Sequence, residues 1–251
     1  VFGISRSPAR LELKHDVIED CSVTDIPDIK PDVKDVADDR PGDIRVDLLL
    51  IGKMVAVGSR VLDVGCGNGE LLEYLEAERQ ADARGIELSQ PGVNRSVGRG
   101  LSVVQGDADT DLAEYPSDAF DFVILSQTLQ ATRQPRQVLK ELLRIGQRAI
   151  VSFPNFGHWS VRTKLLLTGQ MPNTGTLDQP WYSTANIHLC TIRDFVNLCK
   201  ELNITIEQAQ AIDRQGRPIN WASPLFLANL FGDKGLFVLR YDGDREELRR
   251  S

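Results

Sequence analysis

The chain has 251 residues, of which 41% are hydrophobic, and a formal net charge of −7. A chain of this length and apolar content can bury a substantial core, and its negative charge argues against a general grip on nucleic acid, which needs a basic face. No apolar run approaches the roughly 20 residues of a membrane span, and the four cysteines form no Cys-x-x-Cys pair. We therefore expect no membrane and no nucleic-acid partner, and a place in the reducing cytoplasm.

Residues 1–42 differ in composition from the rest of the chain. They hold ten acidic residues against six Lys or Arg, together with four prolines and little apolar periodicity. This pattern predicts a flexible acidic N-terminal leader or linker, with a docking arm for a partner as the alternative. Residues 43–241 are expected to form one cofactor-binding domain, and residues 242–251 a charged C-terminal tail.

A glycine-rich turn follows an expected strand at residues 60–64 and precedes an expected helix from Glu70. Its glycines are Gly65, Gly67 and Gly69, and Asp63 stands two residues before the first of them. Such a turn brings the backbone and a helix start close to a ligand. The spacing is Gly-x-Gly-x-Gly rather than the Gly-x-Gly-x-x-Gly of dinucleotide folds. A carboxylate here disfavours a diphosphate and attracts a cationic ligand, which predicts S-adenosylmethionine (SAM) rather than NAD.

The second expected strand, residues 83–87, ends in an acid. Glu87 lies 18 residues after Gly69, near the offset at which an acid reaches a ribose, and a carboxylate can accept from both ribose hydroxyls. The alternative is a solvated acid at a strand end. Leu88, the next residue, is included in the expected site. Within the turn, Cys66 is expected to be a small filler against the cofactor, since no base to activate the thiol is evident.

The third and fourth strands end in further polar residues. After residues 101–105, Asp107 is expected to accept from the adenine amino group while backbone N–H groups around Ala108 contact the ring. Asp109 and Asp111 are expected to be loop or helix-capping acids. After residues 120–125 come Ser126 and Gln127. Gln127 is expected either to touch substrate or cofactor, or to bond the neighbouring loop backbone.

A fifth strand at residues 148–153 completes the alternation of strands and helices that predicts a parallel sheet. The segment after it contains His158, which is the best candidate for a general base because a neutral imidazole accepts a proton near pH 7. Its alternatives are to orient a loop or to bind a partner. The irregular run at residues 169–187 suggests a lid or binding surface. His158, His188 and Cys190 have no compact ligand spacing, so no metal site is expected.

The C-terminal third predicts two more long strands. Residues 204–211 and 236–241 have strand patterns, and residues 214–220 are expected to be a turn-rich connection. Before the first of these strands, Thr191 and Asp194 have the spacing of a capping box, which predicts a helix start. Cys199 falls on the apolar face of that helix and is expected to be a core thiol.

The glycine turn, Glu87, Asp107 and the fourth-strand segment together resemble class I SAM-dependent methyltransferases over residues 44–241. Three blocks are similar to the MetW family of methionine-biosynthesis proteins: residues 125–131, 151–159 and 186–195. The resemblance implies an α/β, Rossmann-like, seven-stranded, mostly parallel sheet with the last strand antiparallel and helices on both faces. It also implies a partnership with homoserine O-acyltransferase.

Two functions remain open at the level of the sequence. One is a SAM-dependent methyltransferase acting on a small-molecule methyl acceptor. The other is a non-catalytic, SAM-responsive accessory subunit that binds and regulates the homoserine O-acyltransferase, since ligand binding at one site can change a contact elsewhere. An NAD oxidoreductase is disfavoured by the glycine spacing and by Asp63.

Overall fold

The computed structural model describes residues 44–172, 180–219, 225–244 and 248. The predictions for residues 1–42, and for most of the C-terminal tail, lie outside these described residues.

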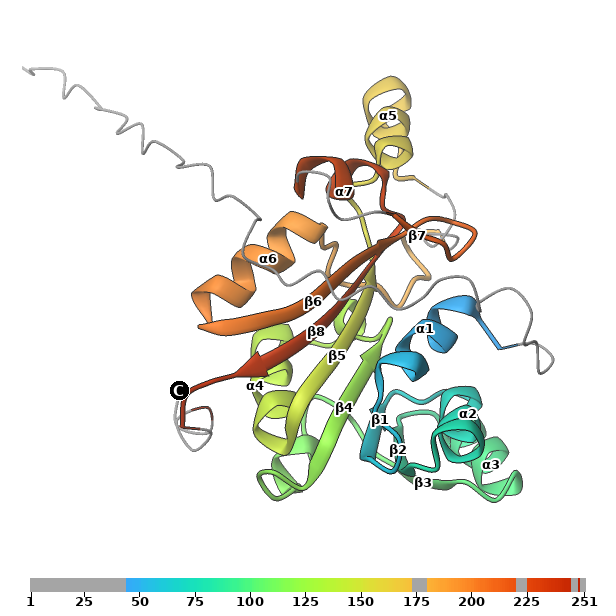
Figure 1. Ribbon diagram of the computed structural model, residues 1–251. Coiled ribbons are helices and arrows are strands. Elements are labelled where there is room, and N and C mark those ends of the chain that lie inside the picture. The colour runs from blue at the N-terminus through green and yellow to red at the C-terminus, as the bar shows by residue number, and fades with distance from the viewer. Residues whose placement is uncertain (1–43, 173–179, 220–224, 245–247, 249–251) are drawn as a thin grey trace, which may run out of the picture.

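A twisted sheet forms the centre of the described chain (Figure 1). The strand order is β3-β2-β1-β4-β5-β8-β6-β7. Strands β1 to β5 are mutually parallel, whereas β8 pairs antiparallel with both β5 and β6. The strand bounds are β1 Arg60–Val64, β2 Asp82–Glu87, β3 Ser102–Gln105, β4 Phe120–Ser126, β5 Gly146–Pro154, β6 Ile204–Ile212, β7 Pro218–Ile219 and β8 Lys234–Tyr241. The long last strand is antiparallel, as expected.

The predicted strand count of seven is wrong for the described residues, which contain eight strands. The additional strand is β7, only two residues long, which pairs antiparallel with the end of β6. It lies in residues 214–220, which were expected to be a turn-rich connection. A strand this short has no alternating pattern to detect, and its pairing to β6 is a long-range contact that the local sequence does not specify.

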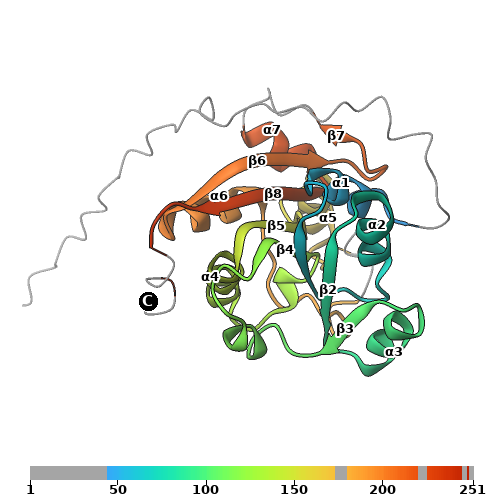
Figure 2. The same cartoon turned by 60° about the horizontal axis from the view of Figure 1, so that its bottom comes forward.

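Helices cover both faces of the sheet, as the resemblance implied (Figure 2). One apolar cluster joins the sheet to α4 and α6, and a second joins it to α1 and α2. The helix bounds are α1 Val46–Met54, α2 Glu70–Arg79, α3 Gln90–Gly98, α4 Pro135–Ile145, α5 Trp159–Thr168, α6 Ile192–Glu201 and α7 Leu225–Phe231, with the 3-10 turns η3 Asp111–Glu114 and η4 Leu129–Ala131. Within the described ranges, no helix has both the length and the apolar character to span a membrane.

The helix start predicted from Thr191 and Asp194 is confirmed, because these two residues form the reciprocal capping box at the start of α6. The side chain of Ser89 caps α3 in a similar way, since it accepts from the Gly92 N–H. Cys199 is fully buried in the apolar cluster under α6, so its expected role as a core thiol is also confirmed.

The parallel strands bring their carboxyl ends to one edge of the sheet. The antiparallel strand β8 begins at the same edge, because Lys234 pairs with Pro154 at the end of β5. The amino end of α1 reaches this edge too, since Asp47 contacts both Gln127 and Lys234. In an open α/β sheet, ligands bind at this edge, where the strand order reverses; here the reversal lies between β1 and β4.

Candidate functional site

The glycine turn after β1 adopts a backbone that L side chains rarely allow. The φ angles are +76° at Gly65, +61° at Gly67 and +80° at Gly69. The N–H groups of Gly65 and Cys66 donate to the carbonyl of Ile86 (2.8 and 3.1 Å), which holds the turn against the end of β2. A Cβ built on Gly67 meets no atom within 4 Å. The turn therefore presents open space at Gly67, where a ligand can approach the backbone.

Glu87 lies directly against this turn. Its Oε2 accepts from the Gly67 N–H (2.8 Å) and its Oε1 accepts from the Ser89 N–H (2.9 Å). Each carboxylate oxygen can accept more than one hydrogen bond, so both retain capacity for a further donor. The structure thus brings together the strand-end acid and the glycine turn that the sequence singled out. Leu88 follows on the exposed surface.

Asp63 is a buried acid with an unsatisfied carboxylate oxygen. Its side chain is 3% exposed, and its buried Oδ1 has no hydrogen-bond partner. Burial raises its pKa to about 7; Arg45 lowers the pKa, whereas Glu87 and Glu70 raise it further. An uncompensated buried carboxylate is costly, and a cationic group placed beside it removes that cost. The site accordingly fits a ligand that carries an ammonium or sulfonium group.

Cys66 has the environment of an inert thiol. Its side chain is buried, and a Cβ built on Gly85 would lie 2.6 Å from its Sγ. Burial is the main cause that raises the pKa of this thiol well above its ordinary range, and Asp63 and Glu87 add to the effect. The thiol stays protonated near neutral pH, so it is no activated nucleophile.

The three acids after β3 have distinct partners. Asp109 accepts from the N–H groups of Arg133 (2.9 and 3.0 Å) and Gln134 (3.0 Å) in front of α4, and Asp111 accepts from the Asp107 N–H (2.9 Å). The expectation that Asp109 and Asp111 are loop or capping acids is confirmed. Asp107 is half-buried beside Ala108, and its Oδ1 accepts from the Asp109 N–H (2.9 Å). Contact of Asp107 and Ala108 with an adenine stays a prediction.

Gln127 has a positive φ of +52° directly after β4. Its Nε2 donates to Oδ2 of Asp47 (2.5 Å), a residue on α1 that lies far away in the sequence. This side-chain bond is neither of the two roles expected from the sequence, although contact with a ligand remains untested. Ser126 lies next to it, with its Oγ 3.2 Å from the Oγ of Ser152 on β5.

Asp47 is a buried residue of this edge that the sequence reasoning missed. Besides Gln127, it contacts Arg45 (3.4 Å) and Lys234 (3.5 Å). In the sequence, Asp47 stands among the apolar residues of α1. A lone acid within an apolar stretch was the signal that could have indicated a buried polar partner.

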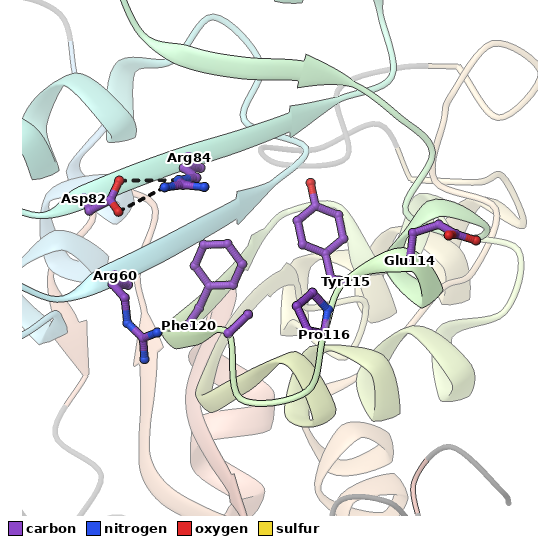
Figure 3. Close-up of a pocket in the computed structure, with 8 residues that line it drawn as sticks. Arg60, Asp82, Arg84, Glu114, Tyr115, Pro116 and Phe120 are labelled. Atoms are coloured by element: carbon purple, nitrogen blue, oxygen red, sulfur yellow. Dashed lines mark hydrogen bonds and ion pairs between the residues drawn. The ribbon is translucent and has the colours of Figure 1, made fainter.

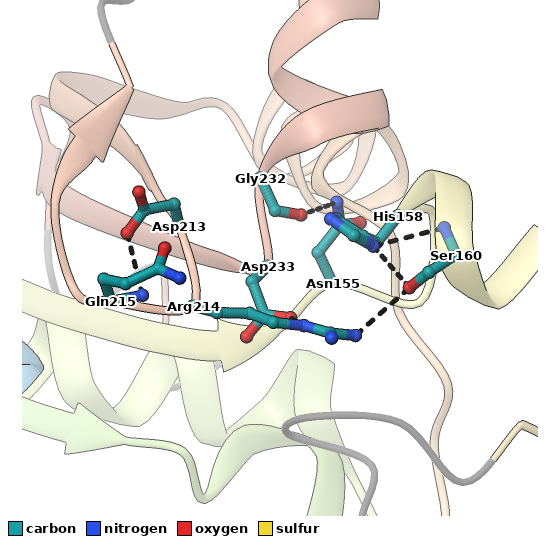
Figure 4. Close-up of polar contacts among 8 residues, drawn as sticks. All are labelled: Asn155, His158, Ser160, Asp213, Arg214, Gln215, Gly232 and Asp233. Carbon is teal, nitrogen blue, oxygen red and sulfur yellow. Dashed lines mark hydrogen bonds and ion pairs between the residues drawn. The ribbon is translucent and has the colours of Figure 1, made fainter.

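His158 is the N-terminal cap of α5 (Figure 4). Its Nδ1 lies 2.8 Å from Oγ of Ser160 and accepts from the Ser160 N–H (3.3 Å). Burial lowers the pKa of the imidazole; Asp233 opposes this shift and Arg214 adds to it. These contacts support the loop-orienting alternative, and action as a general base stays a prediction.

Asn155 connects the segments around His158. Its Nδ2 donates to the carbonyls of Asn229 (2.9 Å) and Gly232 (2.7 Å), and its Oδ1 accepts from the N–H groups of Gly157 (2.9 Å) and Ile192 (3.2 Å). Asn155 therefore joins the end of β5 to α6 and α7. The backbone bond from His188 N–H to the Gln130 carbonyl (2.9 Å) adds the η4 segment. The three blocks that resemble the MetW family thus lie together at the carboxyl edge.

A separate cavity of about 560 Å³ lies at the opposite edge of the sheet (Figure 3). It is bounded by Arg60, Asp82 and Phe120, the first residues of β1, β2 and β4, and by the segment from Glu114 to Ala119. None of the expected site residues lines it, so it is not the candidate site. No group of three or more His, Cys, Asp or Glu within the described residues is arranged to hold a metal ion.

Comparison of the sequence with known proteins gives a family match. The profile of the family described as "Methionine biosynthesis protein MetW" matches residues 45–239. The bifunctional methionine biosynthesis protein MetXA/MetW of Rhodopirellula baltica is 35% identical over 179 residues, which is 67% of this chain but 29% of that protein. An uncharacterized methyltransferase of Schizosaccharomyces pombe is 26% identical over 61% of this chain and 62% of its own length.

Solved structures show the fold class. A SAM-dependent methyltransferase from Mesorhizobium loti superposes with a TM-score of 0.55, at 16% identity, over 78% of this chain and 98% of its own. A TehB-like SAM-dependent methyltransferase from Corynebacterium glutamicum gives a TM-score of 0.52, at 17% identity, over 80% and 90%. The described chain has the Rossmann-like methyltransferase fold.

Proposed function

Because the chain belongs to the family of the methionine biosynthesis protein MetW, we propose that it binds SAM and methylates a small metabolite within methionine biosynthesis. The observation that carries this proposal is the buried side chain of Asp63, whose Oδ1 has no hydrogen-bond partner and which lies just before the open glycine turn. Glu87 contacts the same turn. A nucleoside with a cationic amino-acid tail satisfies all three features at once. A dinucleotide would bring a diphosphate against Asp63 instead.

Each part of the ligand has a candidate partner in the proposed pose. Asp63 accepts from the ammonium group, and Glu87 accepts from the ribose hydroxyls with the lone pairs that Gly67 and Ser89 leave free. Further members of the proposed site are the turn residues and those at the ends of β2, β3 and β4: Gly65, Cys66, Gly69, Leu88, Asp107, Ala108, Ser126 and Gln127.

The cofactor would supply a methyl group on a sulfonium, which is already an excellent leaving group. The residues of the chain then need chiefly to orient the acceptor and exclude water, and well-oriented reactants can reach effective molarities of about 10⁵ M or more. A carboxylate acceptor needs no base. A hydroxyl or a protonated amine would need one, and the neutral His158 is the proposed candidate.

A second candidate function is that of a non-catalytic accessory subunit, which binds homoserine O-acyltransferase and responds to SAM. It is favoured by the Rhodopirellula relative, whose name joins MetXA and MetW in one protein. A single chain holds two units at high effective concentration, an arrangement that suits units that work together.

Helix α5 offers a surface for this proposed contact. It extends away from the sheet in Figure 1, and Val161 is its one residue buried in the core. Leu165, Leu166 and Leu167 are 41%, 85% and 76% exposed. These three consecutive leucines point to different sides of the helix, and an isolated helix of ten residues is marginal in water. Exposed large apolar side chains on such a helix favour an interaction site. We place the acyltransferase on α5.

Two measurements distinguish the candidates. Purified protein incubated with methyl-labelled SAM and a metabolite extract yields a labelled small molecule if the chain is an enzyme, and no such product if it is only an accessory subunit. Co-purification with the acyltransferase, with and without added SAM, tests the accessory role. Acyltransferase activity and affinity that do not change with SAM would contradict SAM sensing.

A further inference from the structure

The cavity at the edge of the sheet opposite the candidate site has an apolar floor and a charged wall (Figure 3). The floor is made by Phe120, which is 6% exposed, and by the half-buried Tyr115, and the centroids of the two rings lie 6.1 Å apart. Asp82 and Arg84 line the cavity from β2. Its volume of about 560 Å³ falls in the range of small-molecule pockets, which combine apolar surface with a few polar groups. The cavity can therefore hold a small ligand that has an apolar part and a charged part.

A buried arginine fixes the segment that closes this cavity. Arg144 on α4 is 2% exposed and pairs with Glu141 (2.7 Å). Its guanidinium donates to the carbonyls of Leu112 (3.0 Å) and Tyr115 (2.8 Å) and to Oγ of Ser117 (3.2 Å). A buried charge is costly unless it is paired and hydrogen-bonded, so these contacts strongly constrain the backbone around Tyr115. The wall of the cavity is preformed, and a ligand that binds there does not need to order a loop.

The charged wall is an exposed ion pair that a ligand can enter. Arg84 donates to both carboxylate oxygens of Asp82 (3.3 and 3.4 Å), and the two side chains are 60% and 56% exposed. Because an exposed pair of this kind contributes little to stability, its two groups can separate and bind a ligand instead. Arg60, a second cation at the cavity, is held by Asp121 through its side chain (3.0 and 3.4 Å) and its backbone N–H (2.8 Å). Arg84 is therefore more available to a ligand than Arg60.

We propose that this cavity binds a free α-amino acid with a large apolar side chain. Such a ligand carries an ammonium and a carboxylate on one carbon, and Asp82 and Arg84 present the opposite charges side by side. The guanidinium of Arg84 binds the ligand carboxylate with two parallel hydrogen bonds, Asp82 accepts from the ammonium, and the apolar side chain covers the rings of Phe120 and Tyr115. A ligand with a single charge would leave one member of the pair without a partner. This site is separate from the proposed cofactor site and does not depend on it.

Titration of the full chain with L-phenylalanine, followed by NMR of the protein, tests the proposal. Saturable binding is expected at millimolar concentration, and the backbone N–H signals of residues 82–84 and 114–120, which border the cavity, should shift. Two analogues separate the charges, because phenethylamine lacks the carboxylate and 3-phenylpropionate lacks the ammonium. Each should bind at least about 10-fold more weakly, as expected for lost hydrogen bonds between charged groups. An analogue that binds as tightly as L-phenylalanine would overturn the proposed recognition.

Arg84→Ala should weaken L-phenylalanine binding by about 10- to 100-fold. Its thermal stability should stay at the wild-type value, because the exposed pair contributes little. Arg95→Ala removes an exposed arginine from α3 and is the matched control, which should bind L-phenylalanine as the wild type does. Unchanged binding by the Arg84 variant, shifts confined to the carboxyl edge of the sheet, or no saturable binding at millimolar concentration would overturn the proposal. None of these results depends on SAM binding, so a failure here leaves the proposed function standing.

Discussion

At the scale of single residues, Asp63 makes stability depend on pH. Its pKa in the folded chain is about 7, above its ordinary value of 3.8, so between these values the folded state binds more protons than the unfolded state. The free energy of unfolding therefore falls as pH rises through this window. Asp63→Asn removes the effect, and its stability advantage over the wild type should widen by about 2 kcal/mol between pH 5 and pH 8.

Urea unfolding at the two pH values measures this advantage. If the stability advantage of the variant is the same at both pH values, Asp63 is ionised at both. A cation would then already compensate its charge in the folded chain, which would contradict this account. The same variant should lose affinity for SAM at pH 8, because the ammonium group loses its acceptor.

Glu87 is predicted to contribute to cofactor affinity. Glu87→Ala removes a charged acceptor and should weaken SAM binding by about 1–3 kcal/mol, as measured by calorimetry. Asp82→Ala is the control, because Asp82 is an exposed acid at the opposite end of the same strand β2. Wild-type affinity in the Glu87 variant would remove Glu87 from the site.

At the scale of elements, Asn155 is predicted to hold three segments together. Its four hydrogen bonds reach the backbone of α7, α6 and the turn before α5. Asn155→Ala leaves buried backbone groups unpaired, at about 1–3 kcal/mol each, so the loss of stability should exceed about 3 kcal/mol. Urea unfolding checks this value against Asn94→Ala, an exposed asparagine on α3. Equal stability of the two variants would contradict the role of Asn155.

A substitution on helix α5 is predicted to weaken partner binding without changing cofactor binding. Leu166→Asp places a charge among the exposed leucines of α5 and should sharply reduce co-purification with the acyltransferase. SAM affinity and thermal stability should stay at wild-type values, because Leu166 is 85% exposed and belongs to neither apolar cluster. Asn94→Asp, at an exposed position of α3, is a control for added charge. Undiminished co-purification of the leucine variant would place the partner elsewhere.

At the scale of the whole molecule, local sequence signals predicted the parallel half of the sheet and its ligand edge. The glycine turn follows β1, and Glu87 ends β2. Because the two strands are parallel neighbours, their ends lie side by side, so the order of the strands was enough to predict that the turn and Glu87 meet. The contacts that Asp47 of α1 makes at this edge could not be predicted in this way. Asp47 and Gln127 are far apart in the sequence, and each has its partner only once α1 packs across the strand ends.

The same limit applies around β5 and β7. The sequence marked His158 as reactive because of its residue type, whereas the charges of Asp233 and Arg214 that act on its imidazole belong to segments far away in the sequence. Strand β7 is defined by its pairing to β6, since two residues have no periodicity of their own. Long-range contacts therefore decided the features that local patterns missed.

Calorimetric titration of the full chain with SAM tests the central claim most directly. The account predicts saturable binding of one SAM per chain, which weakens as pH falls below 7 and Asp63 becomes protonated, with no binding of NAD. A folded chain that takes up no SAM at millimolar concentration would contradict it.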